Sequence, residues 1–246
     1  MVEVPGTTRR AGARRVDPFV IVGGVVLVAM IVAALGFGRG WWGPRQAVPS
    51  TPAPASSIEP GALAAKPIIY LYPTAATDVT VTLSHPERLL AQYPAYGDGW
   101  RVRAQPDGTL TDASGRQFYA LYYEAARSAP AQRTDVGFVV AGADTASFLE
   151  DALPQLGLSP READEFIIYW LPQLQSNPWT YVRFESAGEQ ASEQALSVSP
   201  TPDTVIRVMM DWQRLDAPVQ VAPQTLSAPA RSGFTVVEWG GTQIAG

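Results

Sequence analysis

Hydrophobic residues follow two different patterns along this chain. Phe19–Phe37 is one uncharged, almost wholly apolar run, and as a helix it would span about 28 Å, close to the hydrocarbon thickness of a bilayer. After residue 65 the apolar residues come in short segments separated by Gly, Pro and Asp, which is typical of strands and helices joined by turns. The pattern predicts one membrane-spanning helix followed by a folded domain.

Charges flanking the apolar run predict its direction. Four arginines lie before it, within residues 9–15, and only Arg39 and Arg45 follow it closely. An excess of positive charge on the N-terminal side keeps that side in the cytoplasm. Trp41 and Trp42 follow the run, where indole rings favour the headgroup layer. We therefore expect a signal-anchor in the cell membrane, with the N-terminus cytoplasmic and the body extracytoplasmic.

A cleaved signal peptide is the alternative interpretation of the same segment. Signal peptides have apolar cores of roughly 7–15 residues, and this run is longer. Ala34–Gly36 is a weak small-x-small cleavage site, so cleavage of the anchor stays open. The chain has no Cys, which excludes a lipidated cysteine anchor, disulfides and thiolate metal sites.

Composition divides the chain into four parts. Residues 1–18 are the basic tail, 19–37 the transmembrane helix, 38–65 a Pro/Ala/Ser-rich linker and 66–244 the extracytoplasmic domain. Proline-rich chain is extended, so the linker would hold the domain away from the lipid. From residue 66 onward, 12 Lys and Arg face 20 Asp and Glu, a net charge of −8. This acidic balance disfavours nucleic acid as a partner.

Periodicity within the domain predicts a β-rich α+β fold. Strands are expected over residues 68–72, 79–83, 100–104, 118–124, 137–140, 179–185, 195–198, 204–211 and 234–239. Asp144 can cap a first helix, and Ser159–Glu162 is a capping box for a second. Residues 167–171 are β-branched and aromatic and fit either a helix or a strand. An all-β sandwich with two inserted helices is the alternative fold class.

An internal duplication is a further interpretation, because three pairs of segments match in order. Ile68–Pro73 resembles Ile167–Pro172, Val102–Asp107 resembles Val198–Asp203, and Gly137–Val140 resembles Gly233–Val237. Collinear matches at one spacing are typical of repeats. A true duplication predicts a strand at 167–171; independent strands of similar composition are the alternative.

Catalytic chemistry is limited to carboxylates. His85 is the single histidine, and without Cys a zinc site is excluded; no phosphate loop or nucleophile elbow occurs either. We expect no metal and no cofactor. Glu124, Asp211 and Glu238 lie within or at the ends of apolar strands, where two of them facing one cleft could act as acid and base on a glycan. The alternatives are ion pairing to nearby arginines, Arg183 or Arg207, and simple exposure at a sheet edge.

Aromatic residues are the other candidates for function. Tyr169, Trp170 and Trp239 are the predicted binding residues, because exposed rings can stack on sugar faces or anchor a protein partner. Core filling is the alternative explanation for such rings.

Four segments resemble an uncharacterised family of bacterial envelope-type proteins. They are Lys66–Pro73 (KPIIYLYP), Gly137–Val140 (GFVV), Phe166–Pro172 (FIIYWLP) and Gly233–Gly241 (GFTVVEWGG). The resemblance spans residues 66 to about 242, and its most distinctive piece is Glu238–Gly241. No activity is established for that family, so the resemblance implies a domain boundary and transfers no site residue.

Together these features predict a single-pass protein anchored in the lipid bilayer through residues 19–37. The expected function is an envelope binding or scaffolding module with a glycan or protein partner, which predicts exposed aromatic rings on one face. The alternative is a carboxylate-dependent hydrolase acting on envelope polysaccharide, which predicts that two of the candidate carboxylates share a cleft.

Overall fold

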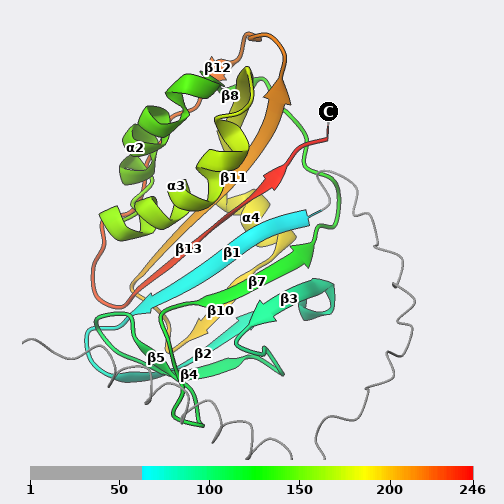
Figure 1. The fold of residues 1–246 in the computed structure, drawn as a ribbon. Coiled ribbons are helices and arrows are strands. Elements are labelled where there is room, and N and C mark those ends of the chain that lie inside the picture. The colour runs from blue at the N-terminus through cyan, green and yellow to red at the C-terminus, as the bar shows by residue number, and fades with distance from the viewer. Residues whose placement is uncertain (1–62, 246) are drawn as a thin grey trace, which may run out of the picture. The chain divides into compact units, whose positions relative to one another are not determined.

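The computed structural model describes residues 63–245, which form a strand-rich α+β domain (Figure 1). The predicted membrane helix at residues 19–37 lies outside the described residues. No helix within 63–245 is both long and apolar enough to cross a bilayer. The first strand begins at Leu63, inside the stretch expected to be linker.

The larger of two sheets has eight strands. In spatial order they are β12 (Ala222–Pro223), β8 (Val136–Ala141), β9 (Trp179–Phe184), β11 (Thr204–Leu215), β13 (Thr235–Gln243), β1 (Leu63–Tyr72), β7 (Leu121–Ala126) and β3 (Leu89–Tyr93). β11 runs parallel to β13, and β12 to β8, whereas the other neighbours are antiparallel.

The smaller sheet has five strands. In spatial order they are β10 (Leu196–Ser199), β2 (Thr77–Leu83), β4 (Trp100–Ala104), β5 (Leu110–Thr111) and β6 (Gln117–Phe118). The helices of the described part are α2 (Thr145–Gln155), α3 (Pro160–Leu174) and α4 (Ala187–Glu193), with short 3-10 turns at Pro86–Arg88 and Gly142–Asp144.

β1 lies between β13 and β7 and is buried on both faces. Ile68 and Tyr70 pack in the cluster that contains α2 and α3, whereas Ile69 and Leu71 pack with the smaller sheet. Because successive side chains of a strand point to opposite faces, one uninterrupted apolar run contributes to two cores. The larger sheet is therefore a central layer with helices on one face and the smaller sheet on the other.

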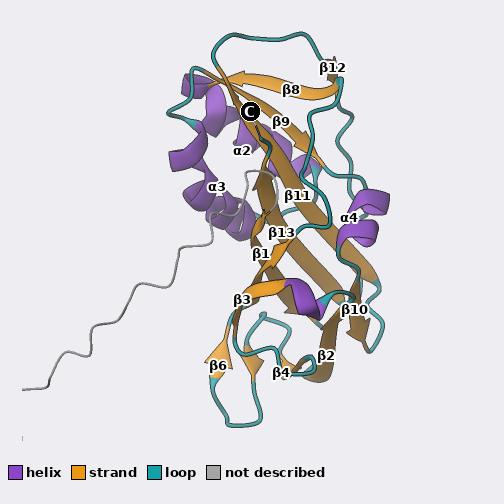
Figure 2. Cartoon of the chain, turned by 90° about the vertical axis from the view of Figure 1, so that its right-hand side faces the viewer, coloured by secondary structure: helices purple, strands orange, loops and turns teal. Residues whose placement is uncertain are grey.

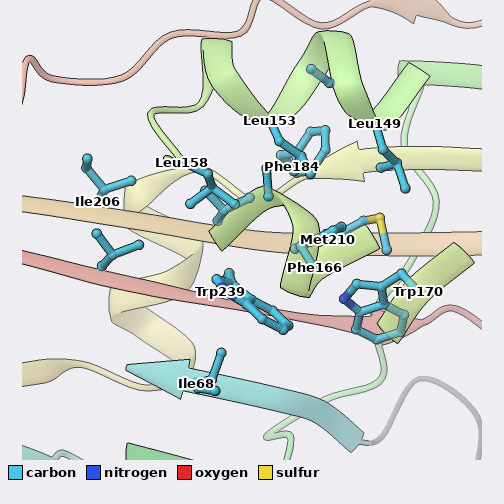
Figure 3. Packing of buried hydrophobic residues seen from close by; sticks show 14 of the residues in the cluster. Ile68, Leu149, Leu153, Leu158, Phe166, Trp170, Phe184, Ile206, Met210 and Trp239 are labelled. Atoms are coloured by element: carbon cyan, nitrogen blue, oxygen red, sulfur yellow. The ribbon is translucent and has the colours of Figure 1, made fainter. Parts of the chain in front are cut away.

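α2 and α3 cover the first face (Figure 3). Leu149 and Leu153 of α2 and Phe166 of α3 are fully buried against strand residues that include Trp239. Figure 2 shows α4 on the opposite side of the larger sheet from α2 and α3. The two faces of the sheet thus have different coverings, a large apolar helical layer and a short polar helix beside the smaller sheet.

Both helix starts can be compared with the sequence. The predicted capping box of α3 is confirmed, because Ser159 accepts a hydrogen bond from the Glu162 backbone and the Glu162 carboxylate accepts one from the Ser159 backbone. Asp144 occupies the N-cap position of α2, but its side chain makes no capping hydrogen bond. The predicted role of Asp144 as a cap is therefore wrong.

The internal duplication is not supported. Ile167–Leu171 lies within α3, whereas its supposed counterpart Ile68–Tyr72 lies in β1. The segment forms a helix rather than a strand because Phe166 and Trp170, four residues apart, bury their rings on one helix face against the sheet. The predicted α+β class is confirmed over the alternative, an all-β sandwich with two inserted helices, since α2 and α3 form a layer that covers one face of the larger sheet.

Candidate functional site

Two cross-strand ion pairs lie in the larger sheet. In the strand registers Arg207 of β11 stands opposite Glu238 of β13, and Asp211 of β11 stands opposite Arg183 of β9. Arg207 and Asp211 are four residues apart on one strand, so both project to the same face. The Arg183 side chain, which lies opposite Asp211 on the same face, is 2.8 Å from Glu189 of α4, so this face is the one that carries α4.

The Glu238 carboxylate is held by two side chains, Tyr123 and Arg207. The Glu238 side chain is fully buried, its Oε1 accepts a hydrogen bond from Tyr123 Oη at 2.7 Å, and its Oε2 is paired with the Arg207 guanidinium. Arg207 Nη2 in turn donates to the Gln194 carbonyl at 2.9 Å. Burial, followed by the Glu238 charge, raises the pKa of Tyr123 well above its ordinary value, so the phenol stays a donor. Both carboxylate oxygens are engaged.

Asp211 belongs to a second group of charges. Arg183 Nη2 lies 2.6 Å from Asp211 Oδ2, and Arg183 Nη1 bonds to Glu189 of α4 at 2.8 Å. Arg127 Nη1 lies 2.7 Å from Glu185 Oε1. Burial, followed by the charge of Glu185, raises the pKa of Asp211 to about 7, although Arg183 and Arg127 act in the opposite direction. The alternative drawn from the sequence, ion pairing to Arg183 or Arg207, is confirmed for Asp211 and Glu238, whereas Glu124 has no such pair among the described residues.

Within residues 63–245, Asp211 and Glu238 are buried and do not line the two cavities nearest to their ion pairs. A cavity of about 30 Å³ lies beside Arg127 and has room for about one water molecule. A groove of about 540 Å³ lies at the edge of the network under loop residues 224–229. Asp211 and Glu238 are absent from the lining of both. Their positions match those of buried structural charges.

Glu124 is separated from the other two candidates by the sheet itself. Its neighbour Tyr123 bonds to Glu238, so Glu124 projects to the opposite face of β7. There burial, followed by a hydrogen bond to Glu124, raises the pKa of Tyr122. The three carboxylates therefore do not converge on one cleft. Within residues 63–245 no group of three His, Asp or Glu residues could hold a metal ion.

An open groove lined by aromatic rings is the second candidate site. Its volume is about 440 Å³. The rings and the cation that define this aromatic groove are Tyr93, Phe118, Tyr119, Tyr122 and Lys66. Tyr93 is 56% exposed and Tyr119 is 52% exposed, and the Tyr93 ring meets Phe118 edge-on at 5.5 Å. Large exposed rings beside a hollow are features of a binding surface.

Lys66 has an unusual backbone. It adopts φ +60°, the one positive φ of a non-glycine residue within residues 63–245, at an irregularity in the pairing of β1 with both β13 and β7. A left-handed conformation costs a lysine on the order of 1–2 kcal/mol. The Lys66 ammonium lies 4.9 Å from the Tyr169 ring centre and 6.0 Å from that of Tyr122, which are cation–π distances.

Two arginines stand at the rim of the aromatic groove. The Arg116 guanidinium lies 4.8 Å from the Phe118 ring centre, and that of Arg161 lies 5.6 Å from the Tyr119 ring centre. Arg161 also pairs with Glu165 at 3.3 Å. The domain carries a net negative charge, so this gathering of cations around exposed rings differs from its average surface.

The three predicted binding residues have different surroundings. Tyr169 lies beside the aromatic groove through its contact with Lys66. Trp170 and Trp239 are buried, and both fill the core between α3 and the larger sheet (Figure 3). Neither indole is accessible to a ligand. The sequence-based list also omitted Lys66 and Tyr93; the only available signal was that Lys66 is the single lysine in the chain.

The site geometry stands without support from known relatives. Comparison of the chain with family models, with curated proteins and with solved structures finds no match.

Proposed function

We propose that this chain is a single-pass envelope protein whose extracytoplasmic domain binds a glycan in the aromatic groove. The observation that carries the proposal is the pair of half-exposed rings, Tyr93 and Tyr119, beside a hollow of about 440 Å³. Flat rings with polar tips complement a sugar, which has an apolar C–H face and hydroxyl edges. The groove supplies the ring faces and the phenol hydroxyls of the tyrosines, together with the Lys66 ammonium.

Buried ion pairs favour binding over hydrolysis. A general acid and a base must reach the glycosidic bond from two sides, whereas Asp211 and Glu238 are buried and Glu124 lies across the sheet. The Arg207–Glu238 pair suits a rigid platform, because breaking a buried charge pair is costly. The carboxylate-dependent hydrolase is therefore the less favoured function.

The membrane topology gives the first prediction. Protease added to intact cells is expected to remove the body while leaving a fragment with the cytoplasmic tail, because residues 19–37 are expected to span the bilayer. Epitope tags at the two ends, followed by immunoblotting, measure this outcome. Cells permeabilised before digestion provide the control. A chain found wholly in the cytosolic fraction and untouched in intact cells would refute the topology.

The aromatic groove gives the second prediction. Tyr119→Ala and Tyr93→Ala are each expected to weaken binding of purified envelope polysaccharide by about tenfold, equivalent to about 1.4 kcal/mol. Each substitution removes a half-exposed ring, so folding should be unaffected. The measurement is a binding isotherm with the full-length protein in detergent micelles.

A matched control is available on α3. Ile168 is 73% exposed and does not line the aromatic groove, so Ile168→Ala removes an exposed apolar side chain elsewhere and should leave binding unchanged. Equal losses in all three variants, or no binding by the parent protein to any envelope glycan, would end the proposal.

A further inference from the structure

Among the described residues, Lys66 and Arg133 are the two Lys or Arg residues without an ion pair to a carboxylate, and Lys66 is the one that lines a groove. Every arginine from residue 66 to 245 except Arg133 forms an ion pair of at most 3.9 Å. Lys66 forms none among the described residues, although its ammonium lies in the lining of an open groove. The ring faces of Tyr122 and Tyr169 are its close partners.

The backbone at Lys66 is in a strained conformation. Irregularities in strand pairing redirect a side chain, and here one coincides with a positive φ on a residue that carries a Cβ. Glycine would adopt this conformation without strain. Strained positions of this kind cluster at binding sites, where they hold a group in place.

The side chains of the aromatic groove indicate which chemical class of ligand would suit it. Rings at Tyr93 and Tyr119 suit the face of a sugar, and an unpaired ammonium suits an anion. Arg116 and Arg161 at the rim are paired with Asp112 and Glu165, which leaves Lys66 as the cation of the groove without an ion pair among the described residues. Glu124 acts on the Tyr122 hydroxyl, and no ion pair joins it to Lys66.

We infer that Lys66 binds the anionic group of an acidic sugar, either a carboxylate or a phosphate, whose ring lies against the tyrosines of the aromatic groove. This inference rests on the proposed function and narrows it to a substrate class. Lys66 would then discriminate acidic from neutral glycans, whereas the tyrosines would contribute to the binding of both kinds.

A single lysine makes the test direct. Full-length protein labelled with ¹³C,¹⁵N-lysine in detergent micelles has one lysine side chain, hence one set of Cε–Hε NMR signals. The probes are glucose, glucuronate and glucose 6-phosphate, which share a ring and differ at carbon 6. Glucuronate or glucose 6-phosphate should shift the Lys66 signal at concentrations where glucose does not, and the stronger of the two identifies the anion.

Variants separate charge recognition from folding. Lys66→Met should weaken binding of the acidic sugar by about tenfold, to the level of glucose, whereas Lys66→Arg should retain a preference for it. Arg133→Gln, at the other unpaired cation, should change nothing. Lys66→Gly should lose the same preference while its melting temperature stays within about 3 °C of the parent protein.

The outcomes distinguish the inference from the proposed function. If neither acidic sugar changes the chemical shift of Lys66 while Tyr119→Ala still lowers polysaccharide binding, Lys66 has no role in recognition and the proposed function stands. Binding of no sugar at all removes both. Three further results would each overturn the inference. An equal response to inorganic phosphate would indicate charge attraction without recognition of the sugar, and a response to tetraglutamate alone would indicate a peptide ligand. Unfolding of Lys66→Gly would indicate that the lysine is structural.

Discussion

Replacing Glu238 by alanine is expected to lower the free energy of unfolding by about 3–5 kcal/mol. The substitution leaves the Arg207 guanidinium, whose side chain is only 12% exposed, without its carboxylate, and it removes the acceptor of the Tyr123 hydroxyl. A buried cation without a counter-charge is among the most costly defects in a protein interior. Urea denaturation followed by tryptophan fluorescence measures the change.

Two further variants show whether charge burial causes this loss. Arg207→Met combined with Glu238→Leu removes both charges and should recover most of the lost stability, because neither charge is then left unpaired. Asp78→Ala breaks the exposed Arg103–Asp78 pair of 3.0 Å and should change stability little. A Glu238→Ala protein as stable as the parent would show that the Arg207–Glu238 pair does not hold the strands together.

Asp211→Asn is expected to stabilise the protein above pH 7 and to flatten its pH dependence. The folded-state pKa of Asp211 is about 7, against an ordinary value of 3.8. Between these values the folded protein binds a proton that the unfolded chain has released, so stability falls as pH rises. The contribution is fully present below about pH 4 and is lost as pH passes 7, a difference on the order of 4 kcal/mol.

Asparagine keeps the neutral shape of Asp211 at every pH, so the variant lacks this decline. Urea midpoints from pH 4 to pH 9 measure the effect, and Asp151→Asn, at an exposed position of α2, supplies the control. The charges that face Asp211 are Arg183 and Glu185 of the β9 region and Arg127 beyond β7. Parallel pH profiles for the parent and Asp211→Asn would mean that Asp211 stays ionised when folded.

Strands and helix starts were predictable where the pattern was local. The alternation of Val79–Leu83 and the capping box of α3 both lie within a few residues of sequence, and both elements occur as expected. The β-branched run Ile167–Leu171 was ambiguous because tertiary burial decided it: Phe166 and Trp170 share one buried face only in a helix.

The expected strand at 118–124 is wrong, because it is divided between β6 in the smaller sheet and β7 in the larger one. β12 was not predicted, and neither were β3 and α4, which the pattern misses for different reasons. β3 has exposed residues at the edge of the sheet, and Leu90 is 51% exposed, so no burial pattern marks it. α4 is polar throughout but begins with the Ser186–Glu189 capping box. The capping box alone therefore marks the start of α4, as it does for α3, although α4 has no apolar face.

The candidate site was predictable only in part. The sequence indicates that Asp211 and Glu238 lie in apolar strands. Their pairing to Arg183 and Arg207 is also predictable, because a buried carboxylate requires a cation. The burial of Trp239 and the exposure of Tyr93 depend on how the layers meet. The position of Lys66 over Tyr169 joins residues far apart in the chain, which no local spacing encodes.

A structure of the full-length protein with a bound acidic oligosaccharide tests the central claim most directly. The account predicts a sugar ring against Tyr93 and Tyr119, with its anionic group within hydrogen-bond distance of the Lys66 ammonium. An oligosaccharide bound elsewhere, for example in the groove under loop residues 224–229, with the aromatic groove empty, would contradict it.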